Sequence, residues 1–163
     1  MLESFRSTTD PFADGPARRH RHRLGMDDQR ARDRADLASS IVVDAAMFIH
    51  TRCGPGLLES AYKAFLTHEL RLRGLTVRSE VDVPVTYRGS KLELGFRLDL
   101  LVEEALVVEL KTVKALAPIH QAQLLSYLRL SGHRMGLLIN FHVPRLRDGI
   151  RRLVDDEPWE LPR

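Results

Sequence analysis

Two acidic residues and a lysine, closely spaced in the chain, could form a metal-dependent catalytic site. Asp99 lies within residues 92–102, where every even-numbered position is apolar, and Glu109 and Lys111 lie in the apolar segment that follows. Alternation with a period of two predicts strands, so Asp99 should face away from the apolar side, and Glu109 and Lys111 should share one face. We therefore expect these three charged groups to converge across two neighbouring strands.

Such a cluster has the chemistry of a metal site. Two carboxylates that lie close together repel each other and are costly to desolvate unless a cation lies between them. A hard divalent ion such as Mg²⁺ is the usual partner of oxygen ligands, and a lysine beside them has a use in chemistry that stability alone would not require. Taken by itself, however, a Glu-x-Lys pair in a strand is most often part of a solvated face.

The elements that must position these residues can be predicted from the spacing of apolar side chains. Helices are expected over residues 36–52, 57–73, 119–130 and 146–154, and strands over residues 77–87, 92–102, 105–111 and 135–141. The first three strands follow one another as a meander. The predicted order is ααβββαβα, a mixed α/β (α+β) fold.

Composition indicates one globular domain with polar ends. The chain has 163 residues, 44% of them hydrophobic, and a formal net charge of +3, which permits a nucleic-acid partner without requiring one. Residues 1–34 are rich in arginine and poor in aliphatic side chains, so we expect a disordered basic tail there. The domain should span residues 35–154, and residues 155–163 should form a C-terminal tail. Residues 1–25 could also be an upstream extension from a wrongly chosen start codon.

The same composition bears on the compartment. Cys53 is the only cysteine, which excludes a disulfide framework and a four-cysteine iron–sulfur site. No apolar run is long enough to span a bilayer, and the first residues lack the apolar core of a secretion signal. We expect a soluble cytoplasmic protein with no membrane association.

Further polar residues lie at helical spacing near the predicted site. Gln123 and Tyr127 are four residues apart, and His120 precedes Gln123 by three, so all three should line one helix face. Glu59 and Tyr62 share a stripe near the start of the second helix, where Tyr62 has equal claims to a packing and a functional role. Order matters here, because a helical glutamate, a strand aspartate, the Glu-x-Lys pair and a Gln-x-x-x-Tyr helix follow one another in the chain.

This order resembles the αβββαβ core of the PD-(D/E)xK nuclease superfamily, with one extra N-terminal helix and one extra C-terminal helix. Residues 56–62 read Gly-Leu-Leu-Glu-Ser-Ala-Tyr, a GxxExxY pattern. Together with Gly54-Pro55, residues 123–127 and the segment 136–141, that pattern is similar to the GxxExxY family of the superfamily. The resemblance covers roughly residues 35–154.

The resemblance implies a Mg²⁺- or Mn²⁺-dependent phosphodiesterase site. In that site Asp99, Glu109 and the backbone carbonyl of Leu110 are metal ligands, and Lys111 positions the attacking water. Glu59 is implied as an outer carboxylate or a ligand of a second metal. Bound metal acidifies water and neutralises charge on the phosphate, while Lys111 adds positive charge where negative charge develops.

The same resemblance places Gln123 and Tyr127 beside the site and the substrate strand. His120 is a further candidate for substrate binding on that helix, with a surface group as its alternative. Arg97 lies beside Asp99 and could hold a substrate phosphate or pair with a carboxylate, and the two interpretations are even.

Two functions fit these residues. The first is a small metal-dependent nuclease that acts on nucleic acid, with DNA favoured over RNA. The second is a catalytically weak nucleic-acid-binding or assembly module that keeps the fold. The intact trio Asp99, Glu109 and Lys111 favours the enzyme, because a binding module has no evident need for it. A homo-oligomer would enlarge the grip on a strand.

Overall fold

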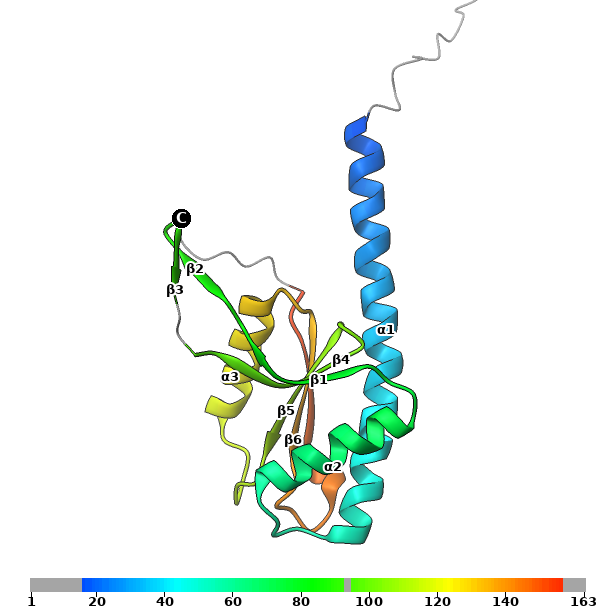
Figure 1. Cartoon of the computed structure of the whole chain (residues 1–163), viewed down its shortest axis with the longest axis vertical. Helices are drawn as coiled ribbons and strands as arrows, with labels where there is room; N and C mark the ends of the chain where they lie inside the picture. Colours follow the sequence, from blue (N-terminus) through cyan, green and yellow to red (C-terminus); the bar gives the residue numbers. More distant parts are fainter. Residues whose placement is uncertain (1–15, 93–94, 157–163) are drawn as a thin grey trace, which may run out of the picture.

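The computed structural model describes residues 16–92 and 95–156 of the chain, with side chains from Met26 onward. Its elements form three layers, in which a five-stranded sheet has helices on both faces (Figure 1). The helices are α1 (Pro16–Cys53), α2 (Glu59–Leu72) and α3 (Pro118–Ser131). Core residues of α1 and α2 pack on one face of the sheet, and those of α3 pack on the other. The mixed α/β class predicted from the sequence is confirmed.

The sheet combines an antiparallel meander with one parallel pair. Its strand order is β1-β4-β5-β6-β7, made by β1 (Val77–Asp82), β4 (Arg97–Val102), β5 (Leu106–Lys111), β6 (Met135–Asn140) and β7 (Ile150–Val154). Among the described strands, β5 and β6 pair in parallel and the other pairs of this sheet are antiparallel. The crossover between them is α3, because parallel neighbours cannot be joined by a tight hairpin.

Strands β5 and β6 form the buried centre of the sheet. Val108 in β5 packs in the cluster under α1 and α2, whereas its neighbour Val107 packs in the cluster under α3. Gly136 in β6 lies against α3, where an added Cβ would be 2.8 Å from Leu124 Cδ1. The end of β5 that carries Glu109 and Lys111 therefore belongs to a strand that is covered on both faces.

The long predicted strand over residues 77–87 is divided in the structure. Strand β1 ends at Asp82, and β2 (Val85–Tyr87) pairs with β3 (Ser90–Leu92) as a separate two-stranded sheet. Pro84 lies between β1 and β2, and proline has no N–H to donate to a ladder. Of the predicted strand over residues 92–102, Leu92 ends β3 and residues 97–102 form β4, while residues 93–94 lie outside the described residues.

The predicted helix over residues 146–154 is wrong. Leu146–Gly149 forms a single 3₁₀ turn, and Ile150–Val154 is the edge strand β7, antiparallel to β6. Both ends of this strand are β-branched residues, which favour extended backbone, and pairing with β6 satisfies its backbone groups. Asp155, assigned to the C-terminal tail, is buried and accepts a hydrogen bond from Arg129 at 2.8 Å. Residues 157–163 lie outside the described residues.

Helix α1 also begins earlier than expected. The sequence analysis predicted a disordered tail to residue 34, whereas α1 begins at Pro16 and residues 16–34 are helical. Arginine, leucine and alanine are good helix formers, so the lack of core contacts does not prevent this helix from extending. Burial in α1 begins at Ala35, which is 2% exposed. Residues 1–15 lie outside the described residues, and the division of the chain into tail and domain stays a prediction.

A search of the described residues for a membrane span finds no helix with the length and apolar character to cross a bilayer.

Candidate active site

Glu109 and Lys111 lie side by side at the end of β5, as the alternation in the sequence predicted. Lys111 Nζ donates a hydrogen bond to Glu109 Oε1 at 2.6 Å. Glu109 is only 4% exposed. Its second oxygen, Oε2, is buried and has no hydrogen-bond partner among the described residues. One carboxylate oxygen therefore holds the lysine, and the other remains as an unsatisfied acceptor.

Asp99 lies beside this pair and is tied to two elements. Its Oδ2 accepts the backbone N–H of Leu110 in β5 at 2.9 Å, and its Oδ1 accepts Lys63 Nζ from α2, also at 2.9 Å. The first bond fixes Asp99 against the backbone that separates Glu109 from Lys111. The three predicted residues therefore do converge.

The strict alternation expected for β4 breaks at Asp99. Leu98 packs in the cluster under α3, whereas Leu100 packs in the cluster under α1 and α2, so these two even-numbered residues do not share a face. The backbone pairing of β4 with β5 runs from Val102 to Leu100, and beyond it the Asp99 side chain accepts the next strand's N–H. Asp99 consequently faces Lys63 of α2.

Burial and charge set the protonation of the pair. Burial, the negative charge of Asp99 and, more weakly, that of Glu59 raise the pKa of Glu109 from 4.5 to about 7, against the opposing effect of Lys111. Burial lowers the pKa of Lys111, but its bond to Glu109 and the charges of Glu109, Glu59 and Asp99 outweigh this and raise it. Lys111 is therefore a cation that is held next to two carboxylates.

Glu59 is the first residue of α2 and is placed by the loop before it. Tyr62 is fully buried and stacks on Phe141, with 4.3 Å between the ring centroids. Its hydroxyl donates to the Gly54 carbonyl at 2.5 Å and accepts the Leu57 N–H at 3.2 Å. Tyr62 thus fixes the turn that leads into α2, which is a packing role, and the spacing of Glu59 and Tyr62 in the GxxExxY pattern follows from it.

With this geometry known, the comparison with family models is decisive. A model described as the PD-(D/E)XK nuclease superfamily matches residues 36–153. The chain belongs to the PD-(D/E)XK nuclease superfamily. No curated protein and no solved structure matches it. Membership suggests hydrolytic nuclease activity on a nucleic-acid substrate, which is the chemistry that the carboxylates and lysine of β4 and β5 predict.

The carboxylate cluster of β4 and β5 contacts residues that the sequence did not predict. Lys63 bridges Asp99 and Glu80, and Glu80 in turn accepts a hydrogen bond from Arg97 at 3.4 Å. Burial lowers the pKa of Lys63, but the bonds and charges of Glu80 and Asp99 raise it overall. A sequence signal for Lys63 existed, because it follows Glu59 by four residues and so lies on the same face of α2.

Arg97 pairs with carboxylates in this structure, and a role for it toward a substrate phosphate stays a prediction. It donates to Asp82 at 3.0 Å and to Glu80. Glu80 lies in β1 with a φ of 54°, in the left-handed region that residues with a Cβ seldom adopt. This strained backbone directs the Glu80 side chain to Lys63 and Arg97, and such strain is often found beside functional sites.

The polar residues of α3 hydrogen-bond within that helix and its N-cap instead of to the carboxylates of β4 and β5. Gln123 Nε2 donates to the Tyr127 hydroxyl at 3.0 Å, and His120 Nδ1 accepts the Ala117 N–H at the start of the helix at 3.0 Å. Within the described part of the chain, none of the three hydrogen-bonds to Asp99, Glu109 or Lys111. The shared face predicted for Gln123 and Tyr127 is confirmed by their contact, and their roles toward substrate stay predictions.

The donor set fits a hard divalent metal. Glu109 Oε2 is an orphaned buried acceptor, Asp99 lies close enough to raise the pKa of Glu109, and the Leu110 carbonyl lies between Glu109 and Lys111 in the chain. Mg²⁺ commonly takes one or two protein carboxylates and keeps several waters. No group of three or more His, Cys, Asp or Glu side chains with metal-site geometry occurs among the described residues. A metal would therefore rest on two carboxylates, a backbone carbonyl and water.

Proposed function

We propose that this protein is a Mg²⁺- or Mn²⁺-dependent nuclease that hydrolyses phosphodiester bonds, with DNA as its preferred nucleic acid. The observation that carries the proposal is the buried, unpartnered Glu109 Oε2 beside Asp99, with Lys111 held on the other Glu109 oxygen. A stable fold has no use for a buried carboxylate oxygen without a partner, since such a group costs free energy. A metal ligand, in contrast, needs an acceptor oxygen that no hydrogen-bond donor occupies.

The roles follow from the positions of the side chains. Asp99, Glu109 and the Leu110 carbonyl would hold the metal, which when bound supplies an acidified water and neutralises phosphate charge. Lys111 keeps its proton and places a positive charge where the attacking water and the developing phosphate charge meet. Glu59, at the start of α2, would hold a second ion or a water. Gln123 and Tyr127 would approach the substrate strand from α3.

Within the superfamily we assign the chain to the GxxExxY family. The support is the linked geometry of Gly54, Leu57 and Tyr62, which places Glu59 at the start of α2. The alternative function, a catalytically weak binding or assembly module, has one observation in its favour. Both oxygens of Asp99 already accept a hydrogen bond, one from Lys63 and one from the Leu110 N–H, so the Lys63 ammonium competes with a metal for Oδ1.

The test is cleavage of labelled single- and double-stranded DNA and RNA, with Mg²⁺, with Mn²⁺ and with EDTA. Lys111→Met should lower the metal-dependent rate about 10²- to 10³-fold, since removal of one placed electrostatic contact typically has this effect. The matched control is Lys114→Met, because Lys114 is exposed and makes no ion pair among the described residues. Circular dichroism checks that each variant is folded.

Equal cleavage by the wild type and Lys111→Met would reject this active site. No cleavage of any substrate with either metal would favour the binding module.

A further inference from the structure

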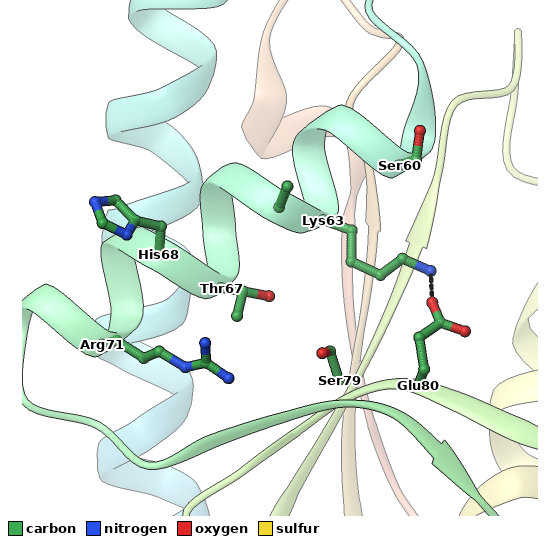
Figure 2. A pocket seen from close by; sticks show the side chains of 8 residues that line it. Ser60, Lys63, Thr67, His68, Arg71, Ser79 and Glu80 are labelled. Carbon is green, nitrogen blue, oxygen red and sulfur yellow. Dashed lines mark hydrogen bonds and ion pairs between the residues drawn. The ribbon is translucent and has the colours of Figure 1, made fainter.

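A pocket lies next to the carboxylate site, between α2 and the edge strand β1. Its volume is about 380 Å³, and it opens to solvent. Six of the eight residues that line it have a hydroxyl group or a basic side chain, and these are Ser60, Lys63, Thr67, His68, Arg71 and Ser79. Figure 2 shows Thr67 and Arg71 on α2 and Ser79 on β1 around the space between the two elements, with Lys63 reaching Glu80.

The charge of this pocket is positive. Arg71 lines the pocket, and its Nη2 donates to the Val77 carbonyl of β1 at 2.9 Å, which ties the guanidinium to the strand. Arg71 makes no ion pair with any carboxylate in the described part of the chain, and a guanidinium has five N–H donors, so donors remain for a ligand. The one acidic group of the lining, Glu80, already accepts hydrogen bonds from Lys63 and Arg97.

The pocket connects directly to the predicted site of cleavage. Lys63 lines the pocket, and its Nζ lies 2.9 Å from Asp99 Oδ1. Strand β1 is the outer strand of the sheet, so nothing in the sheet covers the pocket from that side. A chain of phosphates that passes the carboxylates of β4 and β5 can therefore continue along α2 toward Arg71.

We propose that the α2–β1 pocket is a phosphate-binding subsite for the nucleic-acid strand. This inference rests on the proposed nuclease function and adds the place where a second phosphate of the same strand is held. Guanidinium and hydroxyl groups are the donors that proteins commonly present to phosphate oxygens. Arg71 supplies the charge, Thr67 and Ser79 supply hydroxyl donors, and Lys63 joins the subsite to Asp99.

The experiment measures binding without cleavage. Fluorescence anisotropy of labelled single- and double-stranded DNA is recorded in EDTA over a series of salt concentrations. Loss of one phosphate contact should lower the slope of log K against log salt by about 0.9 for duplex and about 0.7 for single strands. We expect this decrease for Arg71→Gln and for Ser79→Asp, which places a carboxylate in the pocket at an exposed strand position.

The matched control is Arg151→Gln. Arg151 lies in β7 at the opposite edge of the sheet and also donates to backbone carbonyls, those of Asp148 and Ile150, without an ion pair among the described residues. Arg151→Gln should therefore change the affinity and the salt slope less than the pocket variants do. Thermal melting of each variant shows whether it is folded. If Arg71→Gln weakens the fold because the bond to Val77 is lost, Ser79→Asp still tests the pocket, since it leaves Arg71 in place.

Two sources of phosphate are separated by the ligands. If the subsite binds an internal phosphodiester, the pocket variants should lower the salt slope equally for oligonucleotides with a 5′-phosphate and with a 5′-hydroxyl. If it binds a terminal phosphate, the slope should fall only for the oligonucleotide with the 5′-phosphate. Slopes in Arg71→Gln and Ser79→Asp equal to the wild type, or no binding by the wild type, would overturn the proposal. Unchanged slopes with intact metal-dependent cleavage would reject the subsite alone, and reduced slopes without cleavage would reject the nuclease alone.

Discussion

Glu109 is subject to two opposing demands at one position. Its burial disfavours the charged form, whereas a metal and Lys111 both require a carboxylate. In the absence of metal the first demand prevails, and the pKa of Glu109 is raised to about 7. The site is therefore costly to keep ionised when no cation is bound to Oε2, and this cost should appear in the stability of the protein.

A pH series on Glu109→Gln measures that cost in the metal-free protein. Because the pKa of Glu109 in the folded state exceeds its unfolded value of 4.5, its stabilising effect is complete below about pH 4.5 and is lost as the pH rises through about 7. The glutamine stays neutral. Between acidic and mildly alkaline pH, the unfolding free energy of the wild type should therefore fall by up to about 3 kcal/mol more than that of the variant. Urea denaturation in EDTA is the measurement.

Glu104→Gln removes the same charge at an exposed position and serves as the control. Parallel pH profiles for wild type and Glu109→Gln would show that the carboxylate is not perturbed by its surroundings.

At this scale the sequence predicted what depends on local periodicity. Glu109 and Lys111 are two apart in a strand, so their contact follows from the pleat. Lys63 and Glu80 were missed because their contact with each other and with Asp99 joins α2, β1 and β4, which are separated in the chain. The strained φ of Glu80 and the broken alternation at Asp99 likewise depend on neighbours from other elements.

Among the elements, α2 controls the metal site from outside the sheet. It carries Glu59 in its first turn and Lys63 one turn later, so it presents a negative and a positive side chain toward β4 and β5. Lys63 donates a hydrogen bond to Asp99 Oδ1, the oxygen that a metal would also bind, and Lys63 has Glu80 as a second partner. The helix therefore carries a side chain that competes with the metal for Asp99.

Two variants should change metal affinity in opposite directions. Lys63→Met removes the competitor, so it should tighten Mn²⁺ binding about tenfold, since a hydrogen bond between charged groups contributes about 1.5 kcal/mol or more. Glu80→Gln weakens the alternative partner of Lys63, so it should weaken Mn²⁺ binding. Titration calorimetry with Mn²⁺ alone gives both values.

Lys91→Met, at an exposed lysine of β3 without an ion pair in the described residues, controls for net charge. A loss of affinity in both Lys63→Met and Glu80→Gln would mean that the pair only supports the fold.

The elements also show where prediction from sequence ends. Helices α2 and α3 were predictable from apolar residues at helical spacing and from the glycine or proline at their ends, and the strands of the meander from apolar segments separated by turn residues. Strand β7 was not, because the same apolar spacing suits a short helix, and only its pairing with β6 makes the extended form favourable. The extension of α1 to Pro16 does not follow from apolar spacing, because residues 16–34 have few apolar side chains to show a helical period.

For the whole molecule, α1 joins two parts that are distant in the sequence, because it packs in the core and also contacts Asp156. Its buried residues begin at Ala35 and continue through Ala38, Val42, Ala45 and Ala46, so small side chains let the helix lie close to its neighbours. Residues 26–34 are mostly exposed, although Arg32 forms an ion pair with Asp156 at 2.9 Å. Exposed pairs of this kind contribute little to stability. The stabilising part of α1 should therefore start near residue 35.

Two truncations test this boundary. Removal of residues 1–25 should change the unfolding free energy by no more than about 0.5 kcal/mol, because such changes lie away from packed features. Removal of residues 1–40 also deletes the buried methyl groups of Ala35 and Ala38 but keeps Ile41, which packs against the same core. At roughly 0.8 kcal/mol for each buried carbon it should cost about 1.6 kcal/mol. Urea denaturation compares the two with the full chain. Equal stability of the two truncated proteins would show that the packed part of α1 begins after Ala38, and a large loss on removal of residues 1–25 would extend the stabilising part of α1 toward Pro16.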